Sequence, residues 1–104
     1  MLLERRMILV TGAVTAKPDT IVEMLRVSRE HVHRSRQEPG CISHDVSIDA
    51  DDPRKLHFIE RWESAEALKV HFAVPASRAF WKALQELAAD PGGMAIYEAA
   101  LIKI

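Results

Sequence analysis

The chain has 104 residues, of which 48% are hydrophobic and 28% charged, and its formal net charge at neutral pH is −1. That length and composition are typical of a single globular domain, here residues 1 to 104. The small net charge does not favour binding to nucleic acid or to a membrane surface. No apolar run approaches the roughly 20 residues of a membrane span, and Cys41 has no second cysteine to pair with. We therefore expect a soluble, cytoplasmic protein without a signal peptide.

The first half of the chain predicts a strand, a helix and a second strand. Residues 7–16 are apolar and rich in strand-forming side chains, and the Lys-Pro-Asp sequence at 17–19 ends this strand. Residues 20–37 carry apolar and small side chains along one helical face and charged ones elsewhere, which predicts an amphipathic helix. The Glu-Pro-Gly sequence at 38–40 ends the helix, and residues 41–49 then alternate apolar and polar side chains as a half-buried strand does.

The middle of the chain predicts a third strand followed by a broken helical region. A polar loop at 50–54 turns the chain into the strand over 55–62. Ser64 is suited to cap a helix over 65–72. Pro75 is suited to the first position of a further helix, so we expect the helical region to be split there.

The end of the chain and the order of the elements predict the fold. The Asp-Pro-Gly-Gly sequence at 90–93 is typical of a tight turn, and residues 94–104 then form the last strand. The order β-α-β-β-α-β indicates the ferredoxin-like split βαβ fold, an α+β fold with helices on one face of an antiparallel sheet. Apolar side chains of the first and last strands point to both faces of this sheet, and its bare face would expose a large apolar patch. We therefore expect a homodimer that pairs through the sheet faces.

Several short motifs resemble those of one protein family. They are Glu38-Pro39-Gly40-Cys41 after the first helix, Phe58 with Glu60-Arg61-Trp62-Glu63-Ser64 at the end of the third strand, Glu66-Ala67-Leu68 with His71 on the next helix, and Ser77, Arg78 and Phe80 beyond it. Their order and spacing resemble the antibiotic biosynthesis monooxygenase (ABM) family, including its small quinol monooxygenase-like proteins. The resemblance implies a dimeric α/β barrel with a pocket between sheet and helices in each chain. The family also includes haem-degrading enzymes, an isomerase and proteins of no known reaction, so it implies the fold more narrowly than the chemistry.

Candidate catalytic residues lie on the third strand and on the helix after it. Period-two geometry places Phe58, Glu60 and Trp62 on one face of the strand. The next helix folds back over the sheet, which brings His71 near that face. An aromatic substrate suits this group, because His71 or Glu60 can accept a phenolic proton, and these two are the candidate catalytic residues. The candidate substrate-binding residues are Trp62, Phe58, Phe72, Phe80, His44 and Arg78.

The other polar residues predict neither a metal site nor a cofactor. His31 and His33 point about 200° apart on their helix, so they cannot bind one ion together, and the remaining histidines are dispersed along the chain. Asp49, Asp51 and Asp52 lack the following glycine and glutamate of a calcium loop and are typical of a turn.

Three functions remain open at this point. The favoured hypothesis is a cofactor-independent monooxygenase that acts on a small aromatic or quinol-like compound, because a deprotonated quinol can pass an electron directly to molecular oxygen. The alternatives are a non-catalytic module that holds a small hydrophobic ligand or serves in a stress response, and an oxygen-independent isomerase on the same fold. Trp62 and His71 also fit a purely structural role in the core.

Overall fold

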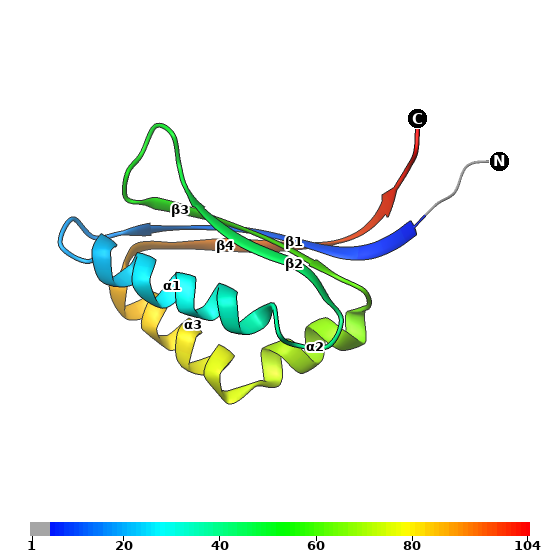
Figure 1. Cartoon of the computed structure of the whole chain (residues 1–104). Coiled ribbons are helices and arrows are strands. Elements are labelled where there is room, and N and C mark those ends of the chain that lie inside the picture. The colour runs from blue at the N-terminus through cyan, green and yellow to red at the C-terminus, as the bar shows by residue number, and fades with distance from the viewer. Residues whose placement is uncertain (1–4) are drawn as a thin grey trace.

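A four-stranded antiparallel sheet with three helices on one face makes up the computed structural model, which describes residues 5–104 (Figure 1). The strands are β1 (Arg5–Ala16), β2 (Cys41–Ile48), β3 (Lys55–Trp62) and β4 (Ala88–Leu101), and they lie in the order β2-β3-β1-β4. The helices are α1 (Ile21–Ser35), α2 (Ala65–Ala73) and α3 (Pro75–Leu87). The predicted ferredoxin-like α+β fold is therefore confirmed. No helix in the described range 5–104 is long and apolar enough to cross a membrane.

The core lies between the sheet and the helices. On β1 and β3, alternate residues such as Val10, Val14 and Leu56 are buried beneath the helices. Figure 1 shows α1 and α3 side by side over this face of the sheet. The opposite face leaves Ile59 of β3 and Tyr97 of β4 41% and 51% exposed. Apolar side chains thus point to both faces of the sheet, as the sequence indicates.

The predicted turn at 90–93 is wrong, because these residues lie inside β4. The pairing of β1 with β4 shifts register between Ala13 and Thr15, so the extra residues are taken up as an irregularity of the strand. Gly92 has a φ of 63°, and a Cβ at this position would lie 1.8 Å from the carbonyl oxygen of Ala13. β4 is at the edge of the sheet, where Pro91 costs no hydrogen bond to a second neighbour.

The turn after α1 is held against the start of α2. Gly40 has a φ of 82°, and a Cβ there would lie 2.5 Å from the Cβ of Ala67. The Glu63 amide donates a hydrogen bond to the Gly40 carbonyl oxygen at 2.8 Å. Ser64 caps α2 as predicted, because its side chain accepts a hydrogen bond from the Ala67 amide at 3.1 Å. These contacts bring Glu38, which precedes the turn, close to α2.

Candidate functional site

A cavity of about 270 Å³ lies between the helix side of the sheet and the helices. Its walls contain apolar and aromatic side chains together with a few polar groups, which is the usual composition of a small-molecule site. The volume is near the lower end of the roughly 300–1,000 Å³ that is typical of ligand pockets. The lining includes six residues that the sequence proposes for the site: His44, Phe58, Glu60, His71, Phe72 and Phe80.

Two of the predicted site residues do not line this cavity. Trp62 is completely buried behind it, with the centroid of its indole 4.7 Å from that of the His71 imidazole. The Trp62 Nε1–H donates a hydrogen bond to Glu60 Oε1 at 2.9 Å. Trp62 therefore holds Glu60 and His71 in place from behind. Arg78 is exposed on α3 and lies apart from the lining.

The His71 imidazole lies between two carboxyl groups, one of which is within hydrogen-bond distance. His71 is 1% exposed, and its Nδ1 lies 2.9 Å from Glu38 Oε1. A carboxylate only accepts hydrogen bonds, so Nδ1 is the donor, and the Nε2 of the neutral ring then carries the lone pair. His71 Nε2 lies 3.8 Å from Glu60 Oε1. Burial raises the pKa of the Glu60 carboxyl, and the hydrogen bond from Trp62 opposes this shift.

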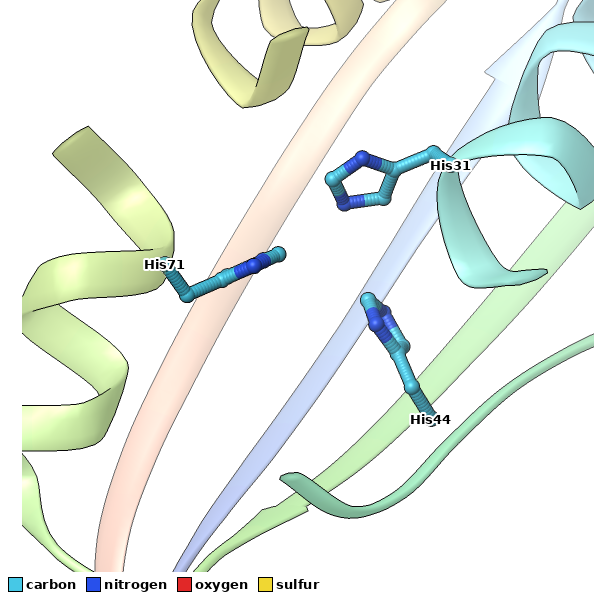
Figure 2. Close-up of side chains that lie close together, drawn as sticks. All are labelled: His31, His44 and His71. Atoms are coloured by element: carbon cyan, nitrogen blue, oxygen red, sulfur yellow. The ribbon is translucent and has the colours of Figure 1, made fainter. Parts of the chain in front are cut away.

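Three histidines converge beside the cavity: His31 of α1, His44 of β2 and His71 of α2 (Figure 2). The ring centroid of His31 lies 5.2 Å from that of His44 and 5.2 Å from that of His71, and the last two are 5.7 Å apart. One ring nitrogen of each lies within 4.8 Å of the others. The histidines are dispersed along the chain, but the inference that they offer no cluster is wrong, because the packing of the helices on the sheet brings three of them together.

Burial keeps two of these imidazoles neutral. Desolvation lowers the pKa of His31 to about 2 and the pKa of His44 to about 3, and the neighbouring imidazoles add to both effects. The His31 ring stacks on Phe80, and its Nδ1 accepts a hydrogen bond from Arg34 Nη2 at 2.8 Å. His44 Nε2 lies 3.6 Å from Glu60 Oε2, whereas its Nδ1 is buried without a hydrogen-bond partner among the residues that the structure describes.

Sequence reasoning missed His31 and Glu38. The helical spacing contains a signal for His31, because it lies three residues after Ser28 and four before Ser35, and both serines are buried on the same face of α1. Glu38 has no such signal. Its partner is 33 residues further along the chain, and only the packing of the turn against α2 brings the two together.

Comparisons with known proteins support the family resemblance that the sequence motifs indicate. The family model described as antibiotic biosynthesis monooxygenase matches residues 7–83. The uncharacterized protein sll1783 of Synechocystis sp. is 34% identical over 93 residues, which are 89% of this chain and 63% of that protein. This chain thus spans less than two thirds of the length of that relative.

Solved structures agree with this assignment. The crystal structure of an antibiotic biosynthesis monooxygenase has 30% sequence identity and a TM-score of 0.83, with 89% of this chain and 98% of that chain covered. Rv0793 from Mycobacterium tuberculosis, at 24% identity, shares the fold with a TM-score of 0.82 over 88% of this chain and 92% of its own. This protein therefore belongs to the antibiotic biosynthesis monooxygenase family.

Proposed function

We propose that the protein is a cofactor-independent monooxygenase that oxidises a small aromatic, quinol-like compound with molecular oxygen. The observation that carries this proposal is the pairing of two proton-transfer groups, His71 and Glu60, inside a small cavity with aromatic walls. A solved relative at 30% identity is described as an antibiotic biosynthesis monooxygenase, which supports the reaction class.

His71 is suited to accept the proton of a phenolic hydroxyl. Its Nδ1–H is engaged by Glu38, so the Nε2 lone pair is the atom available for proton transfer. The resulting substrate anion is electron-rich and can pass an electron to oxygen directly. In the complete reaction one oxygen atom enters the substrate and the other leaves as water together with two substrate hydrogens, so the substrate supplies all the electrons. Phe58, Phe72 and Phe80 offer apolar faces that hold an aromatic ring and limit access of water.

The proposed assembly is a homodimer of single-domain chains. The sheet face opposite the helices exposes Ile59 and Tyr97, and a second copy of this face would cover them and close a barrel. We also propose a cytoplasmic location, since the single Cys41 suits a reducing compartment.

Oxygen uptake with a panel of quinols tests the proposed reaction. We expect turnover by the wild-type protein and a loss of about 10²-fold in the His71→Gln variant if His71 is the base. His33→Gln is a matched control, because His33 is exposed on α1, and it should retain full turnover.

Two results would contradict the proposed function, and a third would contradict the role given to His71. Saturable binding of quinols without oxygen uptake would identify a binding module. Product formation without oxygen would identify an isomerase. Unchanged specific activity of the His71→Gln variant would remove His71 from the mechanism and leave Glu60 as the candidate base.

A further inference from the structure

The arrangement of the three histidine rings matches what a metal ion imposes. An imidazole bound through a metal–nitrogen bond of about 2.1 Å places its ring centroid about 3.2 Å from the ion, so two rings at tetrahedral positions have centroids about 5.3 Å apart. The observed separations among His31, His44 and His71 are 5.2, 5.2 and 5.7 Å. Their nitrogens lie within 4.8 Å of one another, whereas a tetrahedral site requires about 3.4 Å. The ring centroids are therefore spaced as in a metal site, and rotation of the rings about their side-chain torsions would bring the nitrogens closer together.

A carboxylate stands beside two of these rings. Glu60 Oε2 lies 3.6 Å from His44 Nε2, and Glu60 Oε1 lies 3.8 Å from His71 Nε2. Glu60 is 6% exposed and has no cationic side chain from lysine or arginine within salt-bridge distance among the residues that the structure describes. A divalent cation would supply the missing positive charge and hold the carboxyl in its ionised form.

The surroundings of the rings favour coordination at His71 and His44. The Glu38 carboxylate accepts the Nδ1–H of His71, as a carboxylate usually does for the outer nitrogen of a metal-bound histidine, and this leaves Nε2 for the ion. The buried Nδ1 of His44 has no hydrogen-bond partner in the described part of the chain. The His44 ring is thus not committed to a strong hydrogen bond and is able to turn toward an ion.

Arg34 opposes the participation of His31. Arg34 Nη2 donates to His31 Nδ1 at 2.8 Å and to Ser77 Oγ at 3.2 Å. In the neutral His31 ring, Nε2 then carries the hydrogen. Coordination through Nε2 therefore requires Arg34 to release Nδ1 and the hydrogen to be carried on Nδ1 instead. The cation near the cluster also repels a metal ion. His44, His71 and Glu60 are therefore the first ligands, and His31 joins when Arg34 moves away.

We propose that His44, His71 and Glu60, completed by His31, form a binding site for a divalent first-row transition metal ion such as Zn²⁺ or Co²⁺. Two histidines and one carboxylate, or three histidines and one carboxylate, are established donor sets for such ions. The site goes beyond the proposed oxidation, which uses His71 Nε2 and Glu60 free of metal. An ion bound to these atoms blocks the two groups that accept protons in the proposed oxidation. The metal-loaded protein should therefore not catalyse that oxidation.

Titration of chelator-treated protein with Co²⁺ tests the site without any substrate. We expect one ion per chain and the visible absorption of tetrahedral or five-coordinate Co²⁺, with competition by Zn²⁺. His44→Ala and the nearly isosteric Glu60→Gln should each weaken binding at least tenfold, whereas the exposed-residue control His33→Ala should not change it. Arg34→Leu removes the opposing cation and should tighten binding.

The proposal is overturned if no stoichiometric complex forms, or if His33→Ala weakens binding as much as His44→Ala and Glu60→Gln do. Circular dichroism of each variant identifies any that fails to fold, and Glu60→Gln, which changes the volume least, then decides. Because oxygen uptake is measured separately on metal-free protein, failure of the proposed oxidation leaves this result unaffected.

Discussion

Replacing Glu38 by Gln should weaken both the stability and the activity of the protein. The variant keeps the size of the side chain but exchanges a charged hydrogen-bond acceptor of His71 Nδ1 for a neutral one. Hydrogen bonds to charged groups contribute about 1.5–3 kcal/mol and neutral ones about 0.5–1.5 kcal/mol, so the expected loss in the free energy of unfolding is about 1–1.5 kcal/mol. His71 is 1% exposed, so water has little access to replace the lost interaction. For a chain of this size the melting temperature should fall by roughly 5–10 °C.

The effect on activity follows from the tautomer of the ring. A glutamine amide can donate as well as accept, so it no longer requires the hydrogen on Nδ1 of His71. Rings with the hydrogen on Nε2 cannot accept a substrate proton there, and turnover per folded molecule should fall by about tenfold or more.

Urea denaturation and oxygen uptake measure the two effects of Glu38→Gln. Glu30→Gln is the matched control, because Glu30 is likewise a glutamate with a hydrogen-bonded side-chain partner, Arg26, but lies exposed on α1. A surface pair of this kind contributes at most about 0.5 kcal/mol, so the control should be nearly unchanged in stability and activity. Equal results for Glu38→Gln and Glu30→Gln would refute the assigned role of Glu38.

Three further results are expected. Metal-free protein should lose roughly 1.5 kcal/mol of unfolding free energy or more as the pH is lowered from about 6.5 to 5, because the lowered pKa values of His31 and His44 make stability decrease with decreasing pH, and the raised pKa of Glu60 offsets the contribution of about one of them. Urea curves showing equal stability at both pH values would contradict this. Gly92→Ala should lower the melting temperature, because its Cβ would overlap a β1 carbonyl oxygen, and an unchanged melting temperature would rule out that strain. Sedimentation should show a dimer, and Ile59→Lys should shift it toward monomer; a wild-type monomer at micromolar concentration would exclude sheet-face pairing.

Local patterns in the sequence were sufficient for most of the fold. Alternation along β3 depends only on neighbouring residues, so the burial of Phe58, Glu60 and Trp62 on one face could be predicted. The end of α1 and the start of α3 are likewise marked by Pro39 and Pro75, because proline restricts the backbone wherever it occurs. The pattern at 90–93 did not determine the local structure, since the same glycine and proline residues suit either a turn or an irregular edge strand.

The candidate site depends on contacts that the sequence pattern does not contain. His31, His44 and His71 come from three different elements, and Glu38 meets His71, which lies 33 residues further along the chain. Which side chains converge depends on the crossing of α1 and α2 over the sheet and on the close approach at the turn before β2. Sequence periodicity determines which face of an element is buried, but only tertiary packing decides which buried side chains lie opposite one another, because that depends on distances between elements and not along them.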